Sequence, residues 1–177
     1  MKLCLKRKRG IAEFFPDTTA VFDIFAYEDK MAPVERTANA AAAPNTIWQT
    51  CFTNTEDFAK WDPDVSAVTN AEGGCADGGK FTFVMKEGPM KEIHCVLSDV
   101  AQNERLTFSG GALAGLMKFN GTIELTPKDD LNTTVKYTFH LQGLIGSLLS
   151  GTKSVVEGTE GGLTNIVKMS EEAQKEK

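Results

Sequence analysis

The sequence predicts an α+β fold, in which a curved antiparallel sheet of about seven strands wraps around a long C-terminal helix. Three observations support this prediction. Two short helical segments follow the first strand, apolar residues then alternate with polar ones from Val65 to Leu141, and an amphipathic segment closes the chain. A sheet with one apolar face must bury that face, and the terminal helix is the only predicted element long enough to cover it.

The first strand is expected over Pro33 to Ala43, where small or apolar residues alternate with polar ones. Pro44 ends it and suits the first turn of a helix, because the N–H that proline lacks would be unpaired there. A second short helix is expected after the capping-box pattern of Thr53 and Glu56, and Asp62-Pro63 ends it. Apolar residues fall at helical spacing in both helices: Ile47, Trp48, Cys51 and Phe52 in the first, Phe58 and Trp61 in the second.

From Val65 onward the hydrophobic period is two, which predicts five or six consecutive antiparallel strands, each with one apolar face. Gly73-Gly74, Gly78-Gly79, Gly88-Pro89 and Lys128-Asp129-Asp130 mark turns between them. The expected inward positions are Phe81, Phe83, Met85, Ile93, Cys95, Leu97, Leu106, Phe108, Met117, Phe119, Gly121, Ile123, Leu125, Val135, Tyr137, Phe139 and Leu141.

The C-terminal part is predicted to be an amphipathic helix. Apolar residues recur there at helical intervals, at Leu144, Leu148, Val155, Leu163, Ile166, Val167 and Met169. Glycine costs about 1 kcal/mol relative to alanine inside a helix, and several glycines fall between residues 143 and 162. The continuous helix is therefore expected from about Thr152 to Ala173, after a loop or a broken helix.

The chain is expected to hold one domain over residues 31–177, preceded by an extension over residues 1–30 that the fold does not require. The extension begins with the basic run Lys6–Arg9 and continues with acidic and aromatic residues. We interpret it as a solvated tail, with a nuclear address or a contact with anionic lipid as the alternatives.

Composition excludes several classes of protein. A net charge of -5 argues against a general nucleic-acid binder. The four cysteines form no C-x-x-C pair, so they indicate neither a zinc site nor a redox motif, and we expect free thiols in a cytoplasmic protein. No apolar run reaches the roughly 18 residues of a transmembrane helix. We expect no metal, no cofactor, and a monomer or weak homodimer.

A series of short motifs resembles a known superfamily. Ala43-Pro44 followed by Ile47-Trp48 is similar to its entry into the first helix, and Phe58 to Pro63 matches its F-x-x-W-x-P pattern. Further matches follow in order at Gly78-Gly79-Lys80-Phe81, Arg105-Leu106, Gly121 to Pro127 and Asn132 to Val135. Over about residues 33 to 172 the chain resembles the START/Bet v 1-like (SRPBCC) superfamily, most closely its polyketide cyclase/dehydrase branch, which implies the helix-grip fold.

The resemblance implies an internal cavity between sheet and helix that binds a hydrophobic or aromatic molecule of lipid, polyketide, quinone or steroid type. The expected lining is Trp61, Phe81, Phe83, Met85, Phe108, Met117, Phe119, Tyr137, Phe139, Leu163 and Val167. The alternative is a packed core without a functional cavity. Gly121 and Gly162 would enlarge the space in the first case and ease backbone packing in the second.

Two other functions stay open. The first is a cyclase or dehydratase, which needs an acid or base beside a substrate carbonyl. Tyr137 is the inward candidate, whereas His94 and His140 share the outward parity of their strands and become candidates only if a bulge inverts one of them. The second is a protein-binding module, which resembles the chaperone activators of the superfamily.

Overall fold

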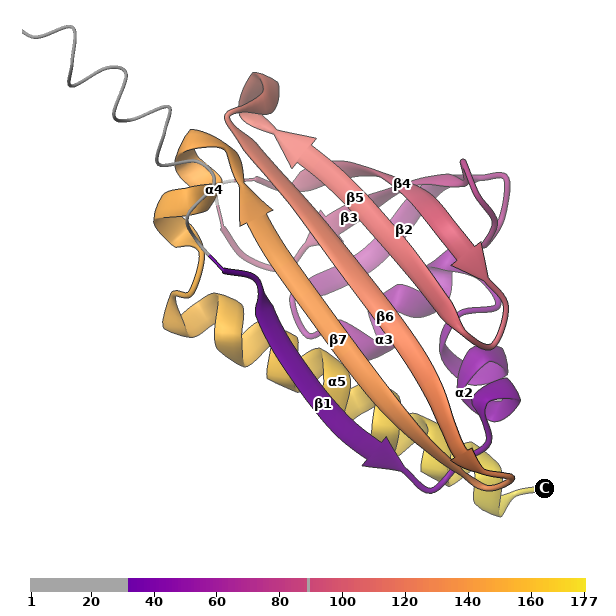
Figure 1. Ribbon diagram of the computed structural model, residues 1–177. Helices are drawn as coiled ribbons and strands as arrows, with labels where there is room; N and C mark the ends of the chain where they lie inside the picture. The colour runs from indigo at the N-terminus through magenta and orange to yellow at the C-terminus, as the bar shows by residue number, and fades with distance from the viewer. Residues whose placement is uncertain (1–31, 89) are drawn as a thin grey trace, which may run out of the picture.

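The computed structural model describes residues 32–88 and 90–177, so the expected extension lies outside the described residues. Seven strands form one antiparallel sheet in the order β1-β7-β6-β5-β4-β3-β2 (Figure 1). Their bounds are β1 Val34–Ala40, β2 Val65–Glu72, β3 Lys80–Met85, β4 Glu92–Ala101, β5 Arg105–Ala112, β6 Met117–Asp129 and β7 Asn132–Gln142. The strands after β1 are consecutive hairpins, and β1 then pairs with β7 at one edge.

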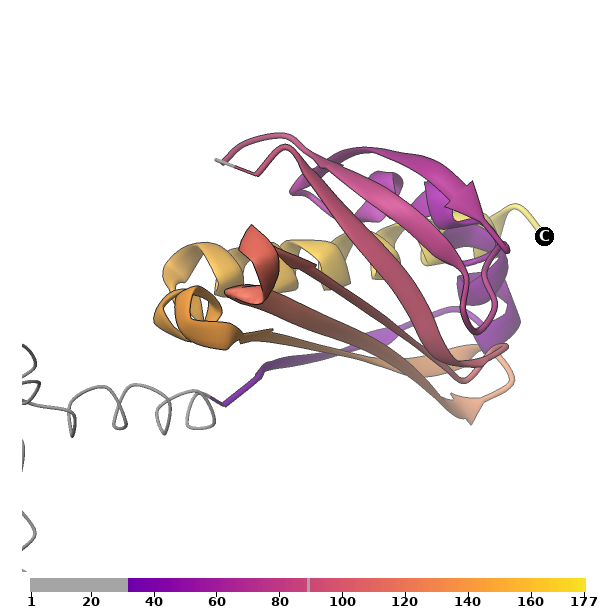
Figure 2. The same cartoon turned by 90° about the horizontal axis from the view of Figure 1, so that it is seen from above.

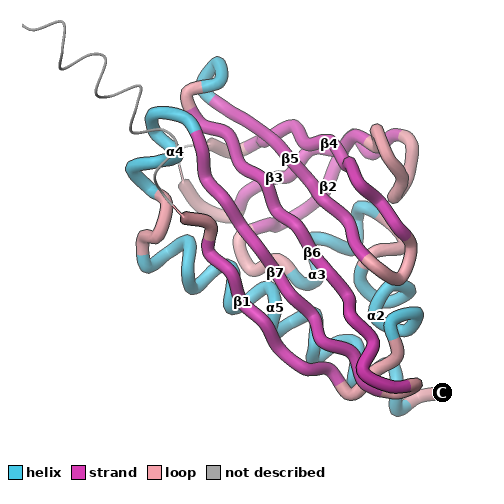
Figure 3. The backbone as a smooth tube through the Cα atoms, in the orientation of Figure 1, coloured by secondary structure: helices cyan, strands magenta, loops and turns pink. Residues whose placement is uncertain are grey.

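The helix α5 crosses the concave side of this sheet from end to end, with α2 and α3 packed against it, while α4 lies at one end of the sheet (Figures 2 and 3). The α-helices are α2 Pro44–Cys51, α3 Phe58–Trp61, α4 Gly143–Leu149 and α5 Lys153–Lys175, and short 3-10 turns are η1 Thr55–Asp57 and η2 Leu113–Gly115. A curved sheet around a long C-terminal helix, with two small helices after β1, confirms the predicted helix-grip α+β fold.

The antiparallel order gives the molecule two distinct ends. The strands β3, β5 and β7 finish at the end that carries η2 and α4, and we call this the α4 end. At the other end β1 finishes before α2, and the tight β4–β5 and β6–β7 turns lie beside it. We call this the α2 end.

The predicted first strand and capping pair need correction. The strand stops at Ala40, because the next residues turn into α2 and are tied to α5: Glu171 accepts the Ala41 N–H at 2.9 Å. The capping carboxylate is Asp57, whose Oδ2 accepts the Asn54 N–H at 3.2 Å. The Thr53 hydroxyl instead donates to the Gln49 carbonyl at 3.2 Å, at the end of α2. That competing bond shifts the cap by one residue.

The C-terminal region contains a second difference. The helix α5 covers the predicted range, with Thr152 as its N-cap, and the broken part before it folds into α4. Leu144 and Leu148, which were counted among the apolar residues at helical spacing, are both exposed. No helix in the described part of the chain is long and apolar enough to cross a membrane.

Candidate functional site

The expected lining residues gather on the concave side of the sheet. Eight are buried: Trp61, Phe81, Phe83, Phe108, Met117, Phe119, Tyr137 and Leu163. Met85, Phe139 and Val167 are half-buried and pack against the same core. From β3 to β7 every buried inward position is uncharged. Asp99 and Asp129 have the inward parity, but both are exposed at register shifts near the ends of β4 and β6. The structure therefore brings the predicted apolar surface together.

Aromatic rings fill the middle of this surface. Phe58, which sequence analysis did not include in the lining, lies at the centre, with ring centroids 5.3 Å from Trp61 and 5.4 Å from Phe81. Phe81 and Phe83 are 4.9 Å apart, and most of these contacts are edge-to-face. Because the rings touch one another, a ligand in the middle of the concave side has to displace some of them.

Two glycines of this region pack directly against aromatic rings. Gly121 faces Phe108 across β5 and β6, and a Cβ there would overlap the Phe108 ring. On α5, a Cβ at Gly162 would lie 3.2 Å from Tyr137 Cε1 and 3.5 Å from Trp61 Cζ3. Both glycines therefore allow close packing, which was one of the two roles expected for them.

Trp61 is held in place by hydrogen bonds at both of its polar ends. Its ring Nε1 donates to the Cys51 carbonyl at 3.3 Å, and its own carbonyl accepts from Asn165 Nδ2 at 2.9 Å. The side chain is fully buried. The predicted signature tryptophan thus joins α2, α3 and α5.

Tyr137 is the only inward residue of β7 with an acidic hydroxyl. Its ring packs between those of Trp61 and Phe108, with centroid distances of 6.0 and 6.4 Å. None of the described residues forms a hydrogen bond with its hydroxyl. Burial, followed by the negative charges of Asp62 and Asp64, raises the pKa of Tyr137 well above its usual range. The hydroxyl can therefore donate a hydrogen bond to a ligand oxygen but is unsuited to act as a base.

Asp62 is a polar residue of this region that sequence analysis treated only as a helix terminator. Burial raises its pKa from 3.8 to about 6, although the hydrogen bond that its Oδ1 accepts from the Asp64 N–H at 2.9 Å acts in the opposite direction. Its charge acts on Tyr137, so the two groups are electrostatically linked. The sequence indicated that Asp62-Pro63 ends α3, but it could not indicate that the Asp62 carboxylate lies near Tyr137 on β7, because that depends on the fold.

The two histidines lie on the outer face of the sheet. His94 Nδ1 is 3.0 Å from the hydroxyl of Thr82, a residue that alternates with the inward Phe81 and Phe83. His140 lies 3.1 Å from Gln142 through its Nδ1, and it pairs in register with Asn120 on β6. Neither histidine reaches the concave side that Tyr137 occupies.

Three apolar side chains at the α4 end of the core are partly accessible to solvent. Met85 is the last residue of β3, Phe139 precedes the end of β7 by three residues, and Val155 lies in the first turn of α5. All three are apolar, half-buried and packed against the core. This end therefore offers apolar surface to an entering molecule.

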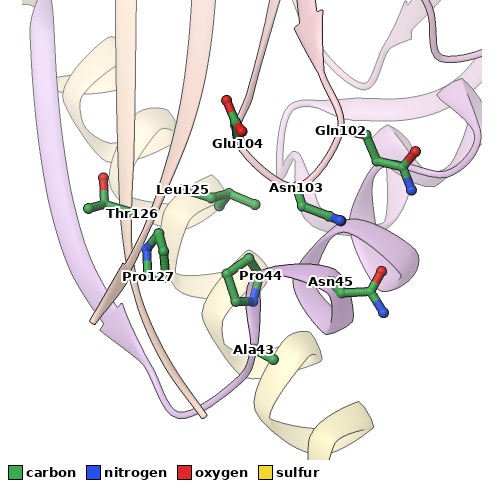
Figure 4. Close-up of a pocket in the computed structure, with 9 residues that line it drawn as sticks. All are labelled: Ala43, Pro44, Asn45, Gln102, Asn103, Glu104, Leu125, Thr126 and Pro127. Atoms are coloured by element: carbon green, nitrogen blue, oxygen red, sulfur yellow. The ribbon is translucent and has the colours of Figure 1, made fainter. Parts of the chain in front are cut away.

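A surface pocket of about 620 Å³ lies at the α2 end (Figure 4). Its lining is Ala43, Pro44, Asn45, Gln102, Asn103, Glu104, Leu125, Thr126 and Pro127, which includes none of the expected lining residues. The buried Oδ1 of Asn103 has no hydrogen-bond partner among the described residues. The pocket carries amides and a carboxylate, so its chemistry differs from that of the concave side.

The described residues show no reactive or metal-binding cluster. Cys51, Cys75 and Cys95 are free, and burial raises their pKa values to about 12, 11 and 12. Such thiols stay protonated and are poor nucleophiles. In residues 32–88 and 90–177 no group of His, Cys, Asp and Glu is arranged to hold a metal ion.

The uncharged concave side and the helix-grip topology agree with a sequence comparison. The profile of a family described as polyketide cyclase/dehydrase and lipid transport matches residues 31–171. The chain belongs to this family. No curated protein matches its sequence.

Solved structures share the fold of this polyketide cyclase/dehydrase and lipid transport family member. Norcoclaurine synthase from Thalictrum flavum is 12% identical, with 100% of this chain and 99% of that chain covered and a TM-score of 0.64. A hypothetical protein from Helicobacter pylori is 11% identical, with 96% and 99% covered and a TM-score of 0.65. A protein from Thermobifida fusca is 20% identical, with 81% and 96% covered and a TM-score of 0.62. These identities show a common fold.

Proposed function

We propose that this protein binds a hydrophobic or aromatic small molecule between the concave side of the sheet and α5. The observation that carries the proposal is the uncharged buried inward surface of β3 to β7, which is partly accessible at the α4 end through Met85, Phe139 and Val155. Burial of apolar ligand surface there contributes about 25 cal/mol per Å². The family description, which includes lipid transport, supports the same class of ligand.

The ligand class follows from the chemistry of the lining. Phenylalanine rings and aliphatic side chains favour a lipid, polyketide, quinone or steroid, and the Tyr137 hydroxyl offers one donor for a carbonyl or hydroxyl oxygen of the ligand. A strongly charged ligand would find no counter-charge among the buried inward residues of β3 to β7 and would lose its hydration.

The direct test is native mass spectrometry of the purified full chain, followed by displacement of a fluorescent fatty acid by a panel of lipids, quinones and steroids. We expect a co-purified small molecule or saturable displacement by at least one panel member. Absence of both would contradict the proposed function.

A matched pair of variants locates the binding site. Val155→Trp adds bulk at the half-buried apolar position of the first α5 turn, whereas Ser154→Trp adds the same side chain at the exposed neighbouring position. We expect affinity for the fluorescent fatty acid to fall about tenfold in the first variant, which is about 1.4 kcal/mol, and to stay unchanged in the second. Equal affinities in the two variants would place the ligand elsewhere.

The second candidate function is an enzyme of the cyclase or dehydratase type. The specific observation that favours it is the hydroxyl of the buried Tyr137, which has no hydrogen-bond partner among the described residues. The Thalictrum flavum synthase with the same fold was solved with dopamine and hydroxybenzaldehyde, two aromatic molecules. If Tyr137 protonates or orients a carbonyl, Tyr137→Phe retains ligand binding and loses turnover. Unchanged turnover in this variant would remove Tyr137 from the mechanism.

We also propose a cytoplasmic location and a monomeric or weakly dimeric state. The three free thiols among the described residues support a reducing compartment. A net charge of -5 disfavours nucleic acid as a partner. Analytical ultracentrifugation of the full chain measures the oligomeric state directly, and a stable tetramer would contradict this part of the proposal.

A further inference from the structure

Helix α4 has its apolar and polar sides inverted relative to a helix that packs on a protein core. Leu144, Leu148 and Leu149 are 39%, 72% and 43% exposed, while Ser147 on the same helix is buried. The Ser147 hydroxyl has no hydrogen-bond partner among the described residues. A helix in water normally places leucine inward and serine outward, because burial of apolar surface is favourable and burial of an unpaired hydroxyl is costly. The arrangement fits a helix whose outer side is not in water.

A second apolar segment lies beside α4. The η2 turn between β5 and β6 exposes Leu113 and Leu116, at 50% and 48%. The Leu116 carbonyl accepts the Ile145 N–H at 3.0 Å, which joins this turn to α4. Figure 2 shows η2 and α4 together at one end of the molecule. We call the five exposed leucines the leucine tip: Leu113, Leu116, Leu144, Leu148 and Leu149.

Lysines flank the leucine tip in the sequence. Residues 109–117 and 141–152 contain no charged side chain, and the first charged residues that follow these two segments are Lys118 and Lys153. Both lysines are exposed. The side chain of Lys118 lies next to η2, because a Cβ at Gly115 would be 3.9 Å from Lys118 Cε. Lys153 Nζ also lies 3.5 Å from Glu157 Oε1, in an exposed ion pair one turn along α5. In a chain of net charge -5, the leucines are therefore bordered by two exposed lysines, one of which is paired.

We propose that the leucine tip docks on an anionic lipid bilayer, with the leucines in the interface and the two lysines at the headgroups. An apolar surface bordered by lysine is the composition that binds such an interface without spanning it. A seven-residue α4 is far too short to cross a bilayer. The phosphate groups of the lipids complement Lys118 and Lys153, whereas a second copy of the chain docked tip to tip would bring the same lysines together.

The position of the leucine tip connects docking with the proposed function. The tip lies at the α4 end, where Met85, Phe139 and Val155 leave the concave side partly accessible. Docking would place that apolar entrance against the bilayer, so an apolar ligand could pass between membrane and protein without crossing water. This consequence rests on the proposed function, but docking itself is measured without any ligand of the concave side.

Vesicle flotation of the full chain tests the proposal, with vesicles of phosphatidylcholine alone and of phosphatidylcholine with phosphatidylserine. We expect binding to the anionic vesicles that weakens on addition of salt. The double variant Leu148→Asp with Leu149→Asp should lower the partition coefficient by about tenfold or more. The matched control is Leu131→Asp, since Leu131 is 59% exposed but lies in the β6–β7 turn at the α2 end. It should bind as the unmodified chain does.

Four results would overturn the proposal. The first is no binding of the full chain to anionic vesicles. The second is equal binding by the double variant, which would assign docking to another segment. The third is vesicle binding only by a chain that starts at Met31, which would show that residues 1–30 cover the leucine tip. The fourth is a dimer that the double variant dissociates while vesicles bind neither protein, which would assign the tip to a second copy. Fluorescent fatty-acid displacement, measured in parallel without vesicles, shows whether the proposed function stands independently of these results.

Discussion

Phe108 and Gly121 show how single residues set the interior of this protein. They are register partners on β5 and β6, and the ring of one occupies the space that a side chain on the other would need. The same relation holds between Phe119 and Gly110, where a Cβ would lie 2.7 Å from the Phe119 ring. Each glycine thus fixes the position of one core aromatic residue.

Gly121→Ala should therefore destabilise the fold by about 1–3 kcal/mol, because the added methyl group forces the buried Phe108 ring to move. Gly111→Ala is the control on β5, where the nearest atom to a new Cβ is 3.2 Å away and the residue is exposed. Urea denaturation at equilibrium measures both. A loss in Gly121→Ala no larger than in the control would contradict the packing that we describe.

The protonation of the Asp62 carboxyl group is expected to affect the stability of the fold. Since burial raises its pKa to about 6 in the folded chain, the folded state holds this proton more tightly than the unfolded state, whose pKa stays near 3.8. The protonated carboxyl therefore favours folding, and this contribution is lost as the pH rises through about 6.

Asp62→Asn should remove this loss of folding stability at high pH, because the amide does not ionise. We expect the variant to be more stable than the parent by about 1–2 kcal/mol near pH 8, with a much smaller difference near pH 4. The amide side chain of the variant keeps an oxygen that can accept the Asp64 N–H. Asp130→Asn, at an exposed carboxylate in the β6–β7 turn, is the control. If the stability difference between Asp62→Asn and the parent were the same at both pH values, Asp62 would not titrate in this range.

At the scale of elements, the small helices depend on α5 for their position. The helix α3 has one turn, and its last residue, Trp61, offers its carbonyl to Asn165 on α5 at 2.9 Å. At the far end of α5, Gln174 Oε1 accepts the Thr46 hydroxyl of α2 at 2.7 Å. Isolated helices of this length are unstable in water, so such tertiary contacts hold them.

Asn165→Ala should cost about 1–2 kcal/mol of stability, because it removes a hydrogen bond to a carbonyl that lies beside a fully buried tryptophan. Thr164→Ala is the matched change on the exposed side of the same helix turn, and it should cost less than about 0.5 kcal/mol. Thermal unfolding followed by circular dichroism compares the two. Equal losses would show that the bond to Trp61 contributes little.

Helices and strands were predicted correctly where local signals, such as proline, glycine and turn residues, agree with the tertiary fold. The strand β5, Arg105–Ala112, contains the inward positions Leu106 and Phe108 that the alternation predicted, and it ends in a glycine-rich segment. The helix α2 begins at Pro44 because proline suits the first turn. The inversion of α4 could not be predicted, because leucines at helical spacing indicate an apolar side without showing which way it points.

At the scale of the whole molecule, the candidate site follows from the alternation of side chains on seven strands. Period-two patterning gave eight of the eleven expected lining residues, the terminal helix gave two, and Trp61 came from the second short helix; all eleven are buried or half-buried in the fold. It could not identify Asp62 or Val155, because their position beside the concave side depends on how α3 and α5 cross the sheet. It also could not show that the rings fill the middle of that side, since packing density is a property of the folded chain.

The two tryptophans allow the most direct test of binding on the concave side. Trp61 contacts the rings of Phe58, Phe108 and Tyr137, whereas Trp48 lies on α2, one turn after Asn45 of the surface pocket. The chain has no other tryptophan. Trp48→Phe and Trp61→Phe therefore each leave one reporter. We predict that a brominated fatty acid, which quenches tryptophan fluorescence by contact, quenches Trp61 in the first variant and leaves Trp48 in the second unchanged. Quenching of Trp48 alone, or of neither tryptophan, would contradict an apolar ligand site between the sheet and α5.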